Sequence, residues 1–150
     1  MQLGLCLHPA DLAGFQELPF DFIEGHVQNF LKPEAPDAEF APLAASARAS
    51  RRPMPSANCF LPGDLKVTGP SVDAARLAKY ADKAFARAKS IGLTTLVFGS
   101  AGARQVPDGW SAARGFEQYV EALKIVGPLG QQHGVTIVVE PLNRGECNLV

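Results

Sequence analysis

The sequence predicts an α/β fold built on a parallel sheet, because short apolar runs alternate with segments of helical periodicity. Five apolar runs occupy residues 3–7, 20–24, 56–61, 94–99 and 135–140. The first and fifth runs begin 132 residues apart, so each of the four units takes about 33 residues and eight would need about 264, close to the roughly 250 of a complete (β/α)8 TIM barrel. The sequence therefore predicts a single partial TIM-barrel domain over residues 1–150, holding the first five strand-helix units, or else an open α/β sheet.

The apolar runs differ in how clearly they indicate strands. Residues 135–140, VTIVVE, are rich in β-branched side chains, which predicts a strand buried on both faces. Alternation along this run places Thr136, Val138 and Glu140 on one face of the strand. The run at residues 56–61 is the weakest signal, because prolines flank it.

The clearest helical pattern lies in residues 71–92, where apolar side chains recur at three- and four-residue spacing. Ser71 is expected to cap the first turn of this helix, because its hydroxyl can accept a hydrogen bond from a backbone amide. Gly92 is expected to take the left-handed conformation that ends many helices.

Two further helices are predicted on either side of that segment. The pattern of residues 111–133 is helical, and Gly127-Pro128 is expected to kink or interrupt it, because proline lacks the amide donor. A third helix is predicted over residues 37–50, where Pro42 is tolerated only near the first turn.

Composition narrows the classes of function. The 150 residues are 47% apolar and 19% charged, which is typical of a globular protein. Fourteen basic and fifteen acidic residues give a net charge of −1, which offers no electrostatic reason to expect a nucleic acid or an anionic membrane as partner. Three widely spaced cysteines without a CxxC pair argue against a disulfide framework and favour a reducing cytoplasm. We find no signal-peptide or membrane-span pattern in the first residues.

Polar residues close the predicted strands, at the edge where parallel α/β proteins bind their ligands. Glu140 ends the fifth run and Glu24 ends the second. A carboxylate at the end of a dry strand needs a cation or several hydrogen-bond donors, and the same surroundings make it a usable base. We therefore favour a functional role for Glu140 over a structural salt bridge. Glu24 is either a second functional carboxylate or one that is hydrogen-bonded to loop amides.

The other strand ends offer weaker candidates. His8 and His26 are either imidazole ligands and acid–base groups or polar side chains bonded to the backbone. In the turn GSAGARQ, Gly99 and Gly102 allow backbone amides to approach an anion near Arg104, but a tight strand-to-helix turn is the simpler interpretation. None of the motifs GxxxxGK[ST], GxGxxG and GxSxG is present.

Several of these segments resemble one family. VVEPLNRGECN, residues 138–148, is similar to the fifth-strand motif of the xylose-isomerase-like TIM-barrel superfamily, and most of all to sugar isomerases and epimerases of the ketose 3-epimerase and hydroxypyruvate isomerase type. FDFIEGHV at the second strand, LPGDLKVTGP after the third and VFGSAGARQVPDG after the fourth follow the order and spacing of that family. The likeness covers nearly the whole chain, and it implies the (β/α)8 fold.

The resemblance implies a metal-dependent isomerase or epimerase that acts on a sugar or other α-hydroxycarbonyl substrate by proton transfer through an enediolate. In such families the Glu of EPLNR ligates manganese, magnesium or cobalt and moves the proton, a role that would fall on Glu140. Substrate contacts would fall on Glu146 and Glu24, and His8 is a further candidate for them. A hard cation held by oxygen and imidazole ligands polarises the carbonyl and lowers the cost of the enediolate.

In the same families an Asp, a His and a Glu from the sixth, seventh and eighth strands complete the metal site, and these 150 residues do not include such strands. We therefore expect that the chain alone does not hold the metal tightly and is incomplete for catalysis. The resemblance then implies a homo-oligomer or a missing carboxyl-terminal half.

Two other functions remain open at this point. A non-catalytic half-barrel would use its exposed strand edges for assembly, because unpaired parallel strands invite pairing with another chain. An apurinic-endonuclease-like zinc enzyme would need several strand-end histidines and a basic groove. The chain offers only His8 and His26 at strand ends, together with a net charge of −1, so we disfavour this last function.

Overall fold

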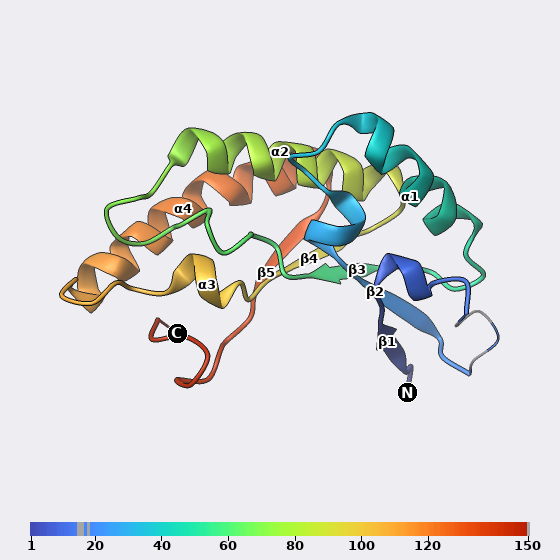
Figure 1. Cartoon of the computed structure of the whole chain (residues 1–150), viewed down its shortest axis with the longest axis horizontal. Helices are drawn as coiled ribbons and strands as arrows, with labels where there is room; N and C mark the ends of the chain where they lie inside the picture. Colours follow the sequence, from blue (N-terminus) through green and yellow to red (C-terminus); the bar gives the residue numbers. More distant parts are fainter. Residues whose placement is uncertain (15–16, 18, 150) are drawn as a thin grey trace.

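The computed structural model describes residues 1–14, 17 and 19–149. Its sheet has five parallel strands in chain order, as Figure 1 shows: β1 (Gly4–Cys6), β2 (Phe22–His26), β3 (Ser56–Asn58), β4 (Thr95–Phe98) and β5 (Thr136–Val139). Sequential order and parallel pairing are the arrangement of successive strands in a TIM barrel. The prediction of a partial barrel with five strands is therefore confirmed.

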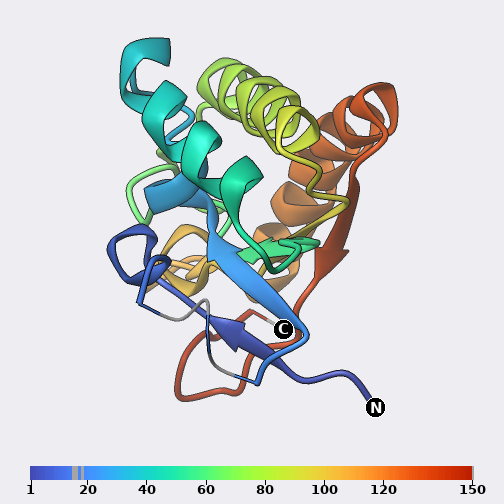
Figure 2. The ribbon, with the colours of Figure 1, turned by 90° about the vertical axis from the view of Figure 1, so that its right-hand side faces the viewer.

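Three long helices cover one face of this sheet (Figures 1 and 2). They are α1 (Asp37–Ala49), α2 (Ala74–Ser90) and α4 (Ala112–His133). Shorter helical segments follow three of the strands: a 3-10 turn at Pro9–Asp11, a π-helix at Val27–Leu31, and α3 at Ala101–Arg104. No helix in the described part of the chain is long and apolar enough to cross a membrane.

The strands turn alternate side chains toward the helices and toward the opposite side, which we call the open face. In β2, Ile23 and Gly25 are buried under the helices, whereas Glu24 and His26 are half-buried. The strand register carries the same alternation across the sheet. The open face and its carboxyl edge thus comprise Cys6, Phe22, Glu24, His26, Ser56, Asn58, Thr95, Val97, Gly99, Thr136, Val138 and Glu140.

The strand β5 is less buried than its sequence predicts. Val138 is 38% exposed and Val139 is 46% exposed. Within the described sheet β5 pairs only with β4, and the helices cover only one of its faces. The prediction that this strand is buried on both faces is therefore wrong, whereas the predicted placement of Thr136, Val138 and Glu140 on one face agrees with the register.

An aromatic cluster fills the space between the sheet and the helices. Phe60 lies at its centre, with its ring centroid 5.4 to 6.0 Å from those of Tyr80, Phe85 and Phe98. All four side chains are almost completely buried. Because Phe60 is the second residue after β3, this packing holds the carboxyl end of that strand against α2.

Helix boundaries agree with the sequence in part. Gly92 has a φ of +83° after α2, as predicted. The cap of α2 is Asp73 and not Ser71, because the Asp73 carboxylate accepts a hydrogen bond of 2.9 Å from the Arg76 amide. The helix α4 continues through Pro128, so the proline does not interrupt it. Gly127 has no Cβ to collide with the proline ring, which removes part of the usual penalty before a proline.

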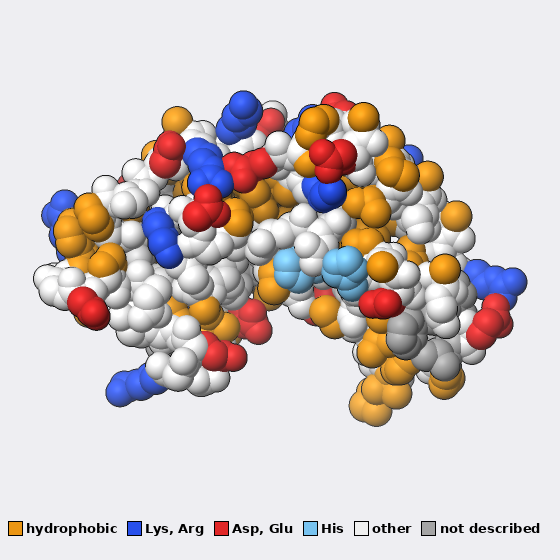
Figure 3. Space-filling model, in the orientation of Figure 1, with side chains coloured by type: hydrophobic (Ala, Val, Ile, Leu, Met, Phe, Trp, Pro, Cys, Tyr) orange, Lys and Arg blue, Asp and Glu red, His pale blue; other side chains and the backbone are white. Residues whose placement is uncertain are grey.

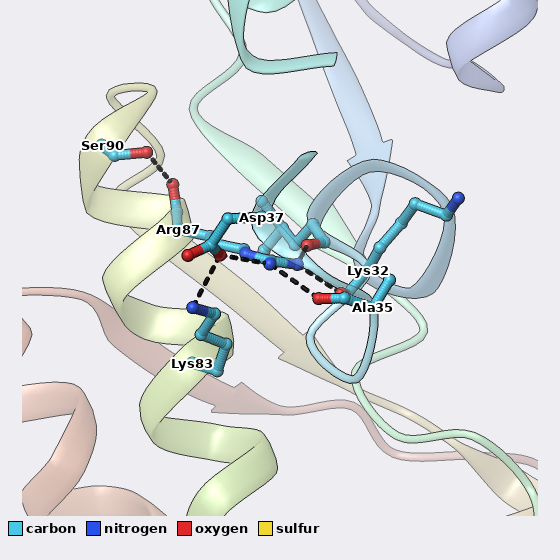
Figure 4. Close-up of polar contacts among 7 residues, drawn as sticks. Lys32, Ala35, Asp37, Lys83, Arg87 and Ser90 are labelled. Carbon is cyan, nitrogen blue, oxygen red and sulfur yellow. Dashed lines mark hydrogen bonds and ion pairs between the residues drawn. The ribbon is translucent and has the colours of Figure 1, made fainter. Parts of the chain in front are cut away.

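The buried Arg87 of α2 ties the segment after β2 to the helix layer (Figure 4). Its guanidinium donates to the carbonyl oxygens of Leu31, Lys32 and Ala35. It also donates to the Asp37 carboxylate at 2.6 Å, and Lys83 Nζ lies 2.7 Å from the same oxygen. These contacts fix the start of α1 against α2.

We expect this cluster to make stability depend on acid pH. The hydrogen bonds from Arg87, and next from Lys83, lower the pKa of Asp37 to about 2. Because the folded-state pKa lies below the ordinary value, the stabilisation is fully present above about pH 4 and is lost as the pH falls through about 2. When the pH is lowered from 4 to 2, the urea concentration at the unfolding midpoint should therefore fall less for Asp37→Asn than for the wild-type protein. Parallel curves for the two proteins would contradict this assignment.

Candidate active site

The Glu24 carboxylate is held by side chains of β3 on the open face. Ser56 Oγ donates to Glu24 Oε1 at 3.0 Å, and Asn58 Nδ2 donates to Glu24 Oε2 at 3.2 Å. Asn58 Nδ2 also lies 3.2 Å from Cys6 Sγ on β1. The alternative of a carboxylate bonded to loop amides is therefore not what the structure shows. Glu24 is instead part of a polar network that crosses three strands.

The two predicted strand-end histidines lie near each other. Burial lowers the pKa of the His26 imidazole, and the neighbouring His8 lowers it further. Figure 3 shows two histidine side chains side by side on the face in view. His8 Nδ1 accepts a hydrogen bond of 3.4 Å from the Ala10 amide and so caps the short 3-10 turn. His26 Nδ1 is buried and has no hydrogen-bond partner among the described residues.

Glu140 follows β5, and its carboxylate reaches over the end of β4. A Cβ atom built on Gly99 would lie 2.1 Å from Glu140 Oε2, so the carboxylate occupies space that any side chain at position 99 would fill. The Glu140 amide donates to the Phe98 carbonyl at 3.3 Å. Glu140 is exposed, and the expectation of a dry environment for it is wrong within the described chain, because the open face has no covering layer there.

Cys59 marks the place where these groups converge. Burial raises the pKa of its thiol, and the nearby Cys6, Glu140 and Glu24 raise it further. The carboxylates of Glu24 and Glu140 thus both act on the Cys59 thiol, at the carboxyl ends of the strands. This is the only grouping of the predicted acidic residues that the described contacts reveal. All three cysteines, including Cys147, are free thiols.

The backbone is strained at the same edge of the sheet. Cys59, directly after β3, has a φ of +53°, and Ser100, after β4, has a φ of +44°. Both residues are in the left-handed region, which is costly for residues other than glycine and is common at functional sites. Ser100 Oγ accepts a hydrogen bond of 2.9 Å from the Leu61 amide, so the two strained loops support each other.

The turn after β4 is a strand-to-helix connection and not an anion site. A Cβ atom on Gly102 would lie 3.1 Å from the Gly63 Cα, so the close approach of two backbones explains this glycine. The Arg104 guanidinium, which the sequence placed near a possible anion, is completely buried and donates to carbonyl oxygens. One of them is the Glu140 carbonyl at 2.9 Å, a contact that the sequence analysis did not foresee.

Glu146 lies apart from the other predicted site residues. Its carboxylate accepts a hydrogen bond of 3.3 Å from the Asn143 amide in its own turn, and its side chain is exposed. Within residues 1–14, 17 and 19–149, no group of three or more His, Cys, Asp and Glu side chains is arranged to hold a metal ion. The donors that are present, with Glu140 as a single carboxylate, do not by themselves fit a divalent cation.

A cavity of about 900 Å³ lies on the helix side, between residues 33–36 and α2. Two of its charged side chains, Arg76 and Glu34, pair with each other at 2.6 Å. Residues of the strands do not line it. We therefore assign the candidate site to the open face, where Glu24 and Glu140 both lie within electrostatic reach of the Cys59 thiol.

Comparisons with solved structures identify the fold. A D-psicose 3-epimerase crystallised in the presence of D-fructose matches with a TM-score of 0.78 and 18% identity, covering 100% of this chain and 55% of that one. The D-psicose 3-epimerase of Clostridium cellulolyticum H10, crystallised with D-tagatose, matches with a TM-score of 0.80 and 16% identity over the same shares. A D-allulose 3-epimerase from Methylomonas sp. matches with a TM-score of 0.70 and 18% identity, covering 95% of this chain and 52% of that one.

These TM-scores establish a shared fold. The chain spans about half the length of the structures that it matches. No curated protein sequence matches the chain. The family model described as xylose isomerase-like TIM barrel matches residues 12–150, which is nearly the whole chain. The chain therefore belongs to the xylose isomerase-like TIM barrel family.

Proposed function

We propose that this protein is an isomerase or epimerase of sugars, of the ketose 3-epimerase type, and that Glu140 is its proton-transfer base. The observation that carries the proposal is the position of the Glu140 carboxylate over Gly99. Glu140 and Glu24 both raise the pKa of the same thiol, Cys59. Solved structures of the same fold are 3-epimerases crystallised with D-fructose, D-tagatose or D-allulose. A ketose is therefore the substrate class that we propose.

The proposed reaction needs a base beside a carbon that carries both a hydrogen and a hydroxyl, next to a carbonyl. The carboxylate of Glu140 takes the proton, the C–H electron pair forms a double bond to the carbonyl carbon, and the C=O π pair moves onto the carbonyl oxygen to give an enediolate. Return of a proton to the opposite face of the same carbon gives the epimer, and its return to the neighbouring carbon gives the isomer. Positioned acid–base groups of this kind contribute rate factors of about 100 to 10,000.

We propose Glu24, Glu146 and His8 as contacts to substrate hydroxyls. Both oxygens of Glu24 already accept hydrogen bonds from β3, so its carboxylate is fixed in place and keeps lone pairs for a further donor. Glu146 and His8 are exposed and each carries only a local hydrogen bond among the described contacts. A ligand can therefore bind Glu146 and His8 without breaking long-range hydrogen bonds of the fold.

Assembly and metal binding are part of the same proposal. We propose that a divalent metal, manganese, magnesium or cobalt, takes Glu140 as one ligand only where an oligomer or a further part of the barrel supplies the other ligands. The exposed side chains of the β5 edge strand, Val138 and Val139, favour such an association. We also propose that the protein works in the cytoplasm, which accords with its three free thiols.

Hydrogen exchange into the substrate tests the proposed function directly. The protein is incubated with D-fructose in D₂O, with and without Mn²⁺, and followed by NMR. We expect deuterium to enter at C3, with D-psicose appearing, for an epimerase, or at C1, with an aldose appearing, for an isomerase. If neither position of D-fructose, D-tagatose or D-allulose exchanges under either condition, the proposal is wrong.

A further inference from the structure

Arg104 is the most deeply buried charged residue near the candidate active site. Its side chain is completely inaccessible to solvent, although the guanidinium is always charged in proteins. Among the described residues no carboxylate lies within ion-pair distance of it. The Tyr119 ring lies under the guanidinium, with its centroid 4.9 Å from Cζ. A buried charge without a carboxylate partner is costly unless other groups compensate for it.

Carbonyl oxygens from three places in the chain provide that compensation. Arg104 Nη1 donates to the carbonyls of Phe98 at 3.2 Å and Gly99 at 3.0 Å, where β4 ends. The same nitrogen donates to the Glu140 carbonyl at 2.9 Å, directly after β5. Arg104 Nη2 donates to the Leu149 carbonyl at 3.2 Å. A single guanidinium therefore binds both ends of residues 140–149, which we call the carboxylate loop.

A second contact closes the carboxylate loop at the same place. Asn148 Oδ1 accepts from the Val106 amide at 2.8 Å, and Asn148 Nδ2 donates to the Val106 carbonyl at 2.9 Å. Cys147 and Leu149 are buried beside these contacts. The loop is thus anchored to residues 104–106 by its two ends, whereas Glu146 in its middle touches only its own turn.

We propose that Arg104 is a positioning residue that holds the carboxylate loop closed and so sets where Glu140 and Glu146 lie. The same guanidinium binds the carbonyls of Gly99 and Glu140, so it fixes the distance between these two backbone positions. The Glu140 carboxylate fits over Gly99 only at that distance. The planar fork of arginine spans several acceptors at once, which the single ammonium of lysine does not reproduce. The consequence for catalysis rests on the proposed function, but the closure of the loop does not.

The test compares Arg104→Lys with Arg87→Lys. Arg87 is the matched control, because it is also a buried arginine that binds backbone carbonyls, but it lies in the cluster at the start of α1. Amide hydrogen exchange is measured for Glu146 and Cys147, which donate to the Asn143 carbonyl within the loop. We expect Arg104→Lys to speed exchange at these amides by about 10- to 100-fold relative to the amides of α2 and α4. Arg87→Lys should leave that ratio unchanged.

A purely structural role for Arg104 predicts another result, since global destabilisation would speed exchange in the loop and in the helices alike. That result, or an unchanged loop in Arg104→Lys, would overturn the proposal. If Arg104→Lys does not fold, Tyr119→Leu replaces it, because this change removes the ring under the guanidinium and keeps the arginine. We then expect a smaller increase of the same sign, confined to the carboxylate loop, and no increase would count against the proposal.

Kinetics supply the second measurement and separate the two proposals. Arg104→Lys should lower kcat by about 10- to 100-fold with little change in KM, as loss of a group that orients a reacting residue does. A fall equal to that in Arg87→Lys would contradict the positioning role. If wild-type protein turns over no sugar, the proposed function fails, and the exchange measurements decide the role of Arg104 alone.

Discussion

Replacing Glu140 by glutamine is expected to lower turnover of the ketose by about 100- to 10,000-fold. Glutamine keeps the shape of the side chain and fits the space over Gly99, but its amide cannot accept a proton at neutral pH. The side chain is exposed, so we expect no measurable loss of folding stability. The rate of deuterium entry into the substrate measures the first effect, and urea unfolding measures the second.

Glu117→Gln is the matched control for that substitution. Glu117 is an exposed glutamate on α4, on the helix side of the sheet, and the same change of charge there should leave turnover unchanged. If Glu140→Gln keeps wild-type activity, Glu140 is not the base. If both variants lose activity to the same extent, the loss reflects net charge and not the position of the carboxylate.

The strands of this fold could be predicted because their signal is local. The strand β5, Thr136–Val139, lies within the predicted run 135–140, and the alternation that places Glu140 on the face of Thr136 and Val138 follows from the geometry of any strand. The burial of β5 could not be predicted in the same way. It depends on which elements cover the strand, and a run of β-branched residues does not contain that information.

The candidate site could be predicted only where a residue closes a strand. Glu24 and Glu140 were found by that rule, and they both act on Cys59. The partners of Arg104 could not be predicted, because its acceptors at Glu140 and Leu149 lie 36 and 45 residues away along the chain. Carbonyl groups are present at every residue, so no pattern of side chains indicates which of them a buried arginine binds.

Replacing Phe60 by alanine is expected to lower the free energy of unfolding by about 3–5 kcal/mol. Phe60 is completely buried and packs against Tyr80, Phe85 and Phe98, so its removal leaves a cavity between β3, β4 and α2. Because Phe60 directly follows Cys59, its loss also removes the packing that holds the strained end of β3. Phe116→Ala is the matched control, since Phe116 is 52% exposed on α4. This replacement should lower the free energy of unfolding much less, by about 0.5 kcal/mol. Urea unfolding measures both variants, and equal losses would mean that the aromatic cluster is not the centre of the core.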